Sequence, residues 1–229
     1  MAVKVCVFDA YGTLFDVSAA ARLAAAEPGR EALAAVWPQL SEVWRAKQLQ
    51  YTWLRAIIGA HVDFWTVTCD GLDYALEAVG LADDAALRDR LRALYHELAA
   101  FPEVPAMLAA LKAAGLQTAI LSNGAPAMLA AAAHSAGIAD SLDAVLSVES
   151  VGVYKPDARV YGLVGAHFGV APAEVLFVSS NGWDAAAATG FGFTTLWVNR
   201  AGDPADRLPW LPTHTARDLS AVSAVAAAL

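Results

Sequence analysis

Short apolar runs that end in polar residues recur along this chain. The first run covers residues 3–8, is mostly apolar and β-branched, and stops abruptly at Asp9. Mostly apolar runs of this length are typical of strands that are buried on both faces of a sheet. We therefore predict five strands, at residues 3–8, 116–122, 142–148, 175–179 and 194–198.

Helical patterns lie between the later runs. They cover residues 103–114, 126–136, 158–168 and 184–188. Strand and helix that alternate in this way predict an α/β fold, with a parallel Rossmann-like sheet and helices on both faces.

The region 17–99 has no clear strand pattern. Seven apolar residues follow a helical three-four spacing, interrupted at Lys47, and this stripe predicts one buried face. The stripe consists of Leu33, Trp37, Leu40, Trp44, Tyr51, Leu54 and Ile58. Proline lacks an amide proton, so Pro38 is expected to break or kink this stretch near its start. We predict a catalytic core of residues 1–16 and 100–229 and an inserted helical cap domain of residues 17–99.

Composition narrows the class of partner. The net charge is −8 and there is no long basic run, which disfavours nucleic acid and anionic membranes as partners. No apolar stretch is long enough for a membrane span, and the first residues do not resemble a signal peptide. Neither Cys6 and Cys69 nor the five histidines match a metal-ligand spacing. Two cysteines in a chain of this size do not make a disulfide scaffold, so a reducing cytoplasm is expected.

Polar residues collect where the predicted strands end. Ligands of a doubly wound sheet bind beyond the carboxyl ends of its strands, so these residues form the candidate site. Four segments supply them: Asp9-Ala10-Tyr11-Gly12-Thr13, Leu121-Ser122-Asn123-Gly124, Tyr154-Lys155-Pro156-Asp157 and Ser179-Ser180-Asn181-Gly182-Trp183-Asp184.

Asp9 is the candidate nucleophile, because a rigidly placed carboxylate can form a covalent ester and divide one hard step into two. A turn-capping role is the alternative for this residue. Lys155 is the candidate counterion that keeps Asp9 ionised, and a surface lysine is its alternative. Ser122 and Asn123 could donate to a ligand or merely form a turn.

With these four segments in this order, the chain resembles the haloacid dehalogenase superfamily, which implies a HAD-like fold with an inserted helical cap. Phosphatases of that superfamily carry further acids where this chain has Tyr11 and Ser180, so no metal or other cofactor is expected. Without a metal, phosphate is a poor substrate, because like charges 4 Å apart repel by about 4 kcal/mol at an effective dielectric constant of about 20. A neutral carbon–halogen centre avoids this repulsion.

The segments Val43–Leu49 and Tyr51–Arg55 make the resemblance narrower, to the L-2-haloacid dehalogenase branch. It implies hydrolysis of short (S)-2-haloacids to 2-hydroxy acids, with inversion and an ester on Asp9. The implied catalytic residues are Asp9, Thr13, Arg45, Ser122, Asn123, Lys155, Tyr161, Ser179, Asn181 and Asp184. The implied substrate-binding residues are Ala10, Tyr11, Arg45, Ser122, Asn123 and Trp183.

The resemblance also implies roles. Arg45, Asn123 and the edge of Trp183 would hold the leaving halide. Ser122 and the amides of Ala10 and Tyr11 would bind the substrate carboxylate. Asp184 would activate the water that hydrolyses the ester, and Tyr11, Leu49, Phe64 and Trp183 would form the apolar wall, although ordinary packing is an alternative for each of these four.

Two other functions stay open at this stage. One is a magnesium phosphatase of the same fold, against which Tyr11 and Ser180 speak. The other is a binding or structural protein on an inactive scaffold, which the joint retention of Asp9, Lys155 and Asp184 opposes. The apolar cap helix with Trp37, Trp44 and Tyr51 also suggests a homodimer.

Overall fold

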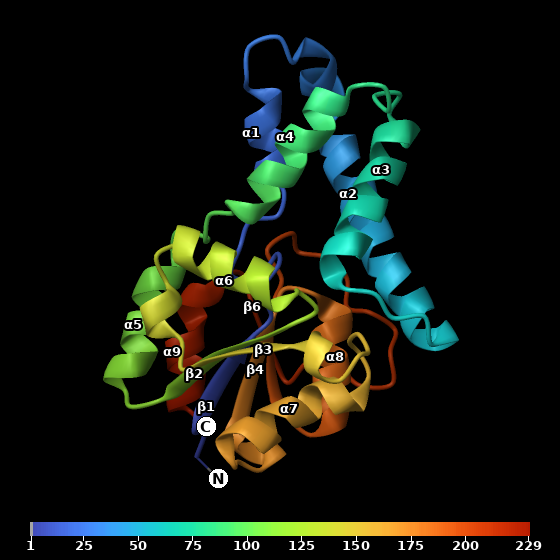
Figure 1. Ribbon diagram of the computed structural model, residues 1–229. Helices are drawn as coiled ribbons and strands as arrows, with labels where there is room; N and C mark the ends of the chain where they lie inside the picture. The colour runs from blue at the N-terminus through green and yellow to red at the C-terminus, as the bar shows by residue number, and fades with distance from the viewer. Residues whose placement is uncertain (1) are drawn as a thin grey trace.

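The computed structural model describes residues 2–229, and a twisted parallel sheet forms its centre (Figure 1). Within that range the sheet has six strands, in the order β3-β2-β1-β4-β5-β6, and every neighbouring pair is parallel. The strands are β1 Val5–Phe8, β2 Gln117–Ser122, β3 Ala144–Ser147, β4 Val175–Ser179, β5 Thr194–Val198 and β6 His214–Ala216. The predicted α/β class with a parallel sheet is confirmed.

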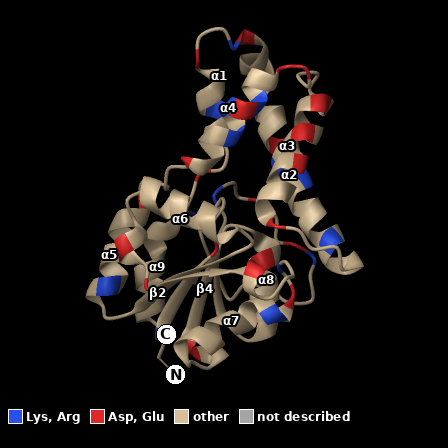
Figure 2. Ribbon diagram, viewed as in Figure 1, with Lys and Arg blue, Asp and Glu red and all other residues tan. Residues whose placement is uncertain are grey.

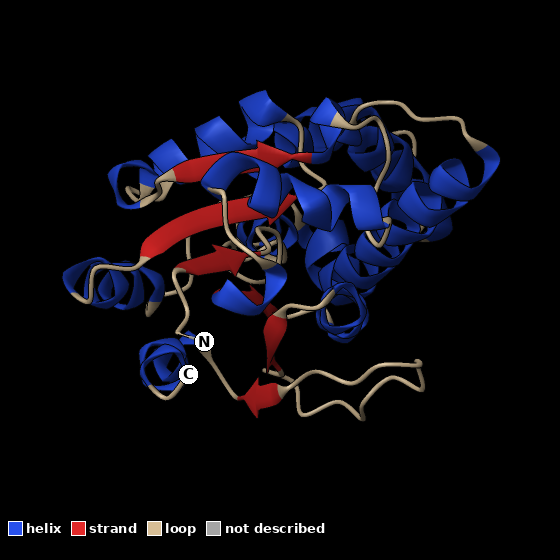
Figure 3. Ribbon diagram, turned by 90° about the horizontal axis from the view of Figure 1, so that it is seen from below, coloured by secondary structure: helices blue, strands red, loops and turns tan. Residues whose placement is uncertain are grey.

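Helices cover both faces of this sheet, as the view from below shows (Figure 3). α5 packs with α9, and α7 packs with α8 across the sheet from them (Figure 1). These helices and α6 are α5 Val104–Ala113, α6 Pro126–Ser135, α7 Ala158–Phe168, α8 Gly182–Phe191 and α9 Val222–Ala227. The predicted helix at residues 184–188 therefore begins two residues earlier and ends three residues later.

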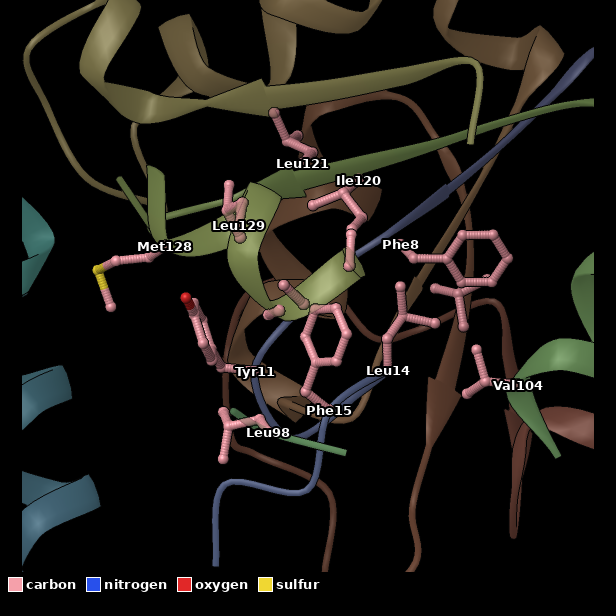
Figure 4. Packing of buried hydrophobic residues seen from close by; sticks show 14 of the residues in the cluster. Phe8, Tyr11, Leu14, Phe15, Leu98, Val104, Ile120, Leu121, Met128 and Leu129 are labelled. Atoms are coloured by element: carbon pink, nitrogen blue, oxygen red, sulfur yellow. The ribbon is translucent and has the colours of Figure 1, made fainter. Parts of the chain in front are cut away.

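β1 lies in the middle of the sheet and is fully buried. Its last residue, Phe8, is level with Ile120 of β2 and Val178 of β4. Figure 4 shows Phe8 and Ile120 packed with Leu14 and Phe15 beneath the carboxyl edge of the sheet. The register of three central strands thus brings the residues that follow them to one edge.

A layer of four helices stands over that edge, and α2 contacts both α1 and α3 (Figure 1). Its members are α1 Ala19–Ala25, α2 Glu31–Ile58, α3 Phe64–Ala78 and α4 Ala85–His96. We call α1–α4 the helical layer. Asp63 and Asp84 cap α3 and α4 by accepting backbone N–H groups, which satisfies donors that a helix start leaves free.

The two chain crossings between the sheet and the helical layer run side by side. The Asp16 amide donates to the Ala99 carbonyl at 3.1 Å, and the Phe101 amide donates to the Leu14 carbonyl at 2.9 Å. These contacts lie near the predicted boundaries of the 17–99 cap domain, although the division into domains itself stays a prediction. Met1, the first residue of the predicted 1–16 segment, lies outside the described residues.

The structure differs from the predictions about the long cap helix in two details. α2 continues through Pro38 without a break. Pro38 and Ala34, whose carbonyl loses its helical partner there, are both exposed, so water can satisfy that carbonyl. The apolar stripe is not buried over its whole length, because Leu54 is 48 % exposed and Ile58 is 71 % exposed. A helix of 28 residues is about 42 Å long, and its C-terminal end extends beyond its neighbours (Figure 1).

The strands of the sheet carry no charged side chains. The six strands contain no Lys, Arg, Asp or Glu, whereas charges of both signs alternate along α4 (Figure 2). None of the helices within residues 2–229 is both long and apolar enough to cross a membrane.

Candidate active site

Asp9 lies directly after β1, is 6 % exposed, and forms the centre of a buried polar cluster. Lys155 Nζ donates to Asp9 Oδ1 at 3.1 Å and to Asp184 Oδ2 at 2.8 Å, so a single cation bridges two carboxylates. Lys155 is 1 % exposed and Asp184 is fully buried. Buried charges are stable in a protein when they are paired, as these three are. Lys155, the predicted counterion of Asp9, is in direct contact with it.

The second oxygen of Asp9 is held by two other side chains. Asn181 Nδ2 donates to Asp9 Oδ2 at 2.9 Å, and the Thr13 hydroxyl lies 3.2 Å from the same oxygen. Thr13 also accepts the backbone N–H of Ser180 at 2.8 Å, which ties the loop after β1 to the end of β4. Gly12 makes this turn possible because its φ is +86° and a Cβ there would lie 3.2 Å from Ser180 Oγ.

Asp184 accepts from three side chains. Tyr161 donates to Oδ1 at 2.7 Å, while Ser179 at 3.1 Å and Lys155 both donate to Oδ2. Burial raises the pKa of Asp184, and the charge of Asp9 adds to this, although Lys155 and Tyr161 oppose it. Burial alone would lower the pKa of Lys155, but Asp184 and Asp9 outweigh that effect and raise it, so Lys155 stays cationic.

The loops after β1 and β2 present polar groups beside this cluster. Asn123 Oδ1 accepts the Lys155 backbone N–H at 3.0 Å, which leaves its Nδ2 as a donor. Ser122 Oγ accepts the Gly124 amide at 3.0 Å and keeps its own hydroxyl proton for another partner. Within residues 2–229, the amides of Ala10 and Tyr11 donate to no backbone or side-chain acceptor. Each of these groups keeps a donor that no other group within residues 2–229 accepts.

Arg45 reaches the same place from the helical layer. Its Nη2 donates to the Tyr11 carbonyl at 3.1 Å and to Asn181 Oδ1 at 3.4 Å. Asn181 therefore connects Arg45 to Asp9. The implied partner of Arg45 at a halide was Asn123, but its contacts in the described chain are with Tyr11, Asn181 and Gln48.

Tyr11 lies between two aromatic rings of the helical layer. Its ring centroid is 5.6 Å from Phe64 and 5.6 Å from Tyr95, and both pairs are stacked. Its buried hydroxyl has no hydrogen-bond partner within residues 2–229. Burial raises the pKa of Tyr11 well above its ordinary value, so this hydroxyl stays protonated. The side chains of Tyr11 and Leu129 lie close together (Figure 4). Both pack against Gly124, where an added Cβ would lie only 2.8 Å from the Tyr11 ring.

Trp183 lies at the start of α8 and packs edge-on against Trp53 of α2, with ring centroids 5.3 Å apart. Both rings line a hollow of about 680 Å³ between the end of α2, α8 and the loop before β6. Tyr154 and Pro156, on either side of Lys155, line it as well. Asp9, Arg45 and Asn123 do not line this hollow, so Trp183 lines a space beside the α8 end of the sheet that the charged cluster does not share. Leu49 is half-buried, and its carbonyl accepts the Thr52 hydroxyl at 2.7 Å.

Some residues around the cluster were not predicted. Gln48 and Tyr95 hold Arg45 and Tyr11, yet neither was singled out. The sequence does predict that Gln48 is buried, because it follows Trp44 by four residues and therefore lies on the same face of α2. Within residues 2–229, no three His, Cys, Asp or Glu side chains are grouped so that they could hold a metal ion.

Comparison with known proteins gives consistent relatives. The model of one family, haloacid dehalogenase-like hydrolase, matches residues 3–192. (S)-2-haloacid dehalogenase 1 of Pseudomonas sp. (strain CBS-3) is 46 % identical over 202 residues, which cover 88 % of this chain and 87 % of that protein. A dehalogenase crystal structure with 41 % identity has a TM-score of 0.92 and covers 97 % of this chain and 96 % of its own. The L-2-haloacid dehalogenase of Xanthobacter autotrophicus with covalently bound chloropropionic acid has a TM-score of 0.88 and 38 % identity, with 99 % of each chain covered.

Proposed function

The chain belongs to the haloacid dehalogenase-like hydrolase family, and from this premise we propose that it is an (S)-2-haloacid dehalogenase. One observation carries the proposal: Lys155 bridges Asp9 and Asp184, so that a nucleophile and a base share one buried cation. The substrate would be a short 2-haloacid, and the products a 2-hydroxy acid and a halide.

In the first step, an oxygen of Asp9 attacks C2 from the side opposite the halogen. A carbon–oxygen bond forms, the carbon–halogen bond breaks, and the electron pair leaves with the halide. This gives an ester on Asp9 with inversion at C2. Arg45 is the candidate halide ligand, supported by its link through Asn181 to Asp9, and Asn123 Nδ2 and Trp183 are proposed to assist it.

The substrate carboxylate is proposed to lie beside the free amides of Ala10 and Tyr11 and the hydroxyl of Ser122. Backbone donors that point into one place favour an anion. Tyr11, Phe64, Leu49 and Trp183 are the proposed apolar surroundings of the alkyl group.

In the second step, water attacks the carbonyl carbon of the Asp9 ester. Asp184 accepts one proton from the water and returns it to the product oxygen as the bond between that oxygen and the carbonyl carbon breaks. The other water proton leaves the new carboxyl group for solvent, so Asp9 regains its carboxylate. Tyr161 and Ser179 support this role because both donate to Asp184. The new oxygen therefore enters Asp9 first.

Two measurements test the proposal. Chloride release from (S)-2-chloropropionate or chloroacetate is expected in the presence of EDTA, since Lys155 supplies the positive charge at the site. A single turnover in ¹⁸O-water should place the label in Asp9 and not in the product. If no short 2-haloacid releases halide, the proposal is wrong, and magnesium-dependent turnover of a phosphate ester would replace it with a phosphatase.

We also propose a cytoplasmic homodimer that binds neither nucleic acid nor membranes. Exposed apolar residues at the end of α2, Leu54, Ile57 and Ile58, favour a second copy as their cover. Both cysteines are free, in keeping with a reducing compartment. A monomeric mass at micromolar concentration, measured by light scattering, would contradict the dimer.

A further inference from the structure

Gln48 is a buried amide that none of the proposed catalytic roles uses. It lies on α2 three residues after Arg45 and is 1 % exposed. A buried polar side chain is costly unless its hydrogen bonds are made, and both ends of this carboxamide are engaged. Oε1 accepts from Arg45 Nη1 at 2.8 Å, while Nε2 donates to Thr68 Oγ1 at 2.7 Å and to Tyr95 Oη at 2.9 Å.

These bonds allow a single orientation of the amide. Arginine has donors and no acceptor, so the atom of Gln48 that faces Arg45 must be the oxygen. Thr68 gives its hydroxyl proton to the Phe64 carbonyl at 2.7 Å and therefore accepts from Gln48. If the amide were turned over, donors would face the guanidinium and an acceptor would face Thr68.

Close packing of two helices maintains this arrangement. At Gly71 of α3, a Cβ would lie 3.3 Å from the Gln48 backbone nitrogen and 3.4 Å from the Trp44 carbonyl oxygen. Trp44 Nε1 also donates to the Thr68 carbonyl at 2.8 Å. The missing side chain of Gly71 lets α3 approach α2, and this brings Thr68 within hydrogen-bond reach of Gln48.

The other terminal nitrogen of Arg45 faces the reaction centre. While Nη1 is bound to Gln48, Nη2 lies at the Tyr11 carbonyl and Asn181, which itself donates to Asp9. The guanidinium is planar, so fixing one nitrogen limits the rotation of the whole group. Free arginine side chains carry about 2 kcal/mol of rotamer entropy, which a fixed partner reduces in advance of binding.

We propose that Gln48 is a positioning residue that aims Arg45 at the leaving halide through the path Thr68–Gln48–Arg45, without contacting substrate itself. The inference rests on the proposed function, in which Arg45 holds the halide. A hydrogen bond to a charged group of this kind corresponds to about a ten- to hundredfold effect on rate.

The kinetic test uses Gln48→Met, which keeps the side-chain length and removes the hydrogen bonds. Its kcat for chloroacetate should fall about ten- to hundredfold. The loss for iodoacetate should be smaller, because iodide leaves with less help. Gln50→Met on the exposed side of the same helix is the matched control, and its rate should equal that of the wild type. Gln48→Glu restores an acceptor for Arg45 and should recover part of the rate.

A double mutant separates positioning from general structural damage. In an Arg45→Ala background, adding Gln48→Met should change the rate by less than about twofold, because the path it supports is already gone. Full additivity of the two losses would overturn the inference. If Gln48→Met does not fold, Thr68→Val keeps the shape, removes the acceptor for Gln48, and should show the same leaving-group dependence at smaller size.

A crystal structure of Gln48→Met decides the inference without any activity. The Arg45 guanidinium is expected to leave the Tyr11 carbonyl and Asn181, and an unchanged guanidinium would overturn the proposal. A wild type that releases no halide would refute the proposed function, while this structure would still report on Arg45. A wild type that is active and a Gln48→Met variant with unchanged rates would refute the positioning role alone.

Discussion

The two halves of the candidate site are held by different means. At the sheet edge, Asp9 and Ser179 lie at the ends of paired strands, and their separation is set by backbone register. Arg45 instead comes from α2 at the end of a long side chain that is half-buried and secured by Gln48. A charge placed by strand ends is insensitive to small shifts of a neighbouring helix, whereas one placed by a side-chain network depends on how that helix packs. The sheet edge therefore suits the covalent chemistry, and the helical layer suits recognition.

Of the substitutions at the sheet edge, we expect Asp9→Asn to lower the rate of halide release most. An amide is a far weaker nucleophile than a carboxylate, so halide release should fall by about four orders of magnitude or more. Initial rates of chloride release measure this. Asp83→Asn, at an exposed position in the turn between α3 and α4, is the control and should leave the rate unchanged.

Lys155→Met should cost both activity and stability. It leaves Asp9 and Asp184 buried without their shared cation, a change that typically lowers the free energy of unfolding by about 3–5 kcal/mol. The rate should fall about a thousandfold, because the nucleophile loses the cation that contacts and orients it. Urea unfolding and steady-state kinetics test the two effects.

Lys112→Met removes a comparable ion pair at the surface, where Lys112 contacts Asp143 at 2.6 Å. Its cost should stay below about 1 kcal/mol, because solvent screens exposed pairs. Equal losses for the two lysine variants would show that burial of the cation has no special effect.

Tyr161→Phe tests the sheet-edge half of the site through the pH dependence of kcat. Burial raises the pKa of Asp184, and the Tyr161 hydrogen bond partly opposes this rise. The ionised form of Asp184 is the base, so activity should increase as pH rises through its pKa. Without the Tyr161 hydroxyl that pKa rises further, and the acid limb of kcat should move to higher pH.

Tyr74→Phe provides the matched control, since Tyr74 is 43 % exposed and lies in the helical layer. Its profile of kcat against pH should overlay that of the wild type. An acid limb that stays in place in Tyr161→Phe would argue against Asp184 as the base.

Gly71→Ala tests the helical layer with the smallest change. The added Cβ would press on the backbone of α2 at Gln48 and shift the helices by a few tenths of an ångström. The rate should fall a few-fold, with a larger loss for chloroacetate than for iodoacetate, and the hydrolysis of a preformed Asp9 ester should be unaffected. Gly162→Ala is a suitable control, because a Cβ at Gly162 meets nothing within 4 Å.

The sequence was most informative where structure is local. β4 and β5 match their predicted bounds because a short uncharged run with a polar end is a strong pattern for a buried parallel strand. The same pattern located Asp9, Ser122 and Ser179, and the superfamily resemblance ordered them into a site. The predicted family and fold are confirmed by the comparisons.

Features that depend on tertiary packing were not predictable. β6 has three residues, too few to show a period, and it forms because β5 offers an open edge. Pro38 stays within α2 at an exposed position, where Ala34, whose carbonyl loses its helical partner, is exposed as well. The contacts of Gln48 depend on the close approach of α3 at Gly71, which no spacing within α2 reveals.

The adjacency of the two chain crossings at Asp16–Ala99 and Leu14–Phe101 has a consequence for engineering and for descent. A segment whose ends lie next to each other can be exchanged for another with similarly spaced ends without rerouting β1 or α5. The sheet edge, with its nucleophile and its cation, would then persist while the recognition surface is replaced. We therefore expect substrate preference to change when the segment between Asp16 and Ala99 is replaced, while the sheet that carries the nucleophile is kept.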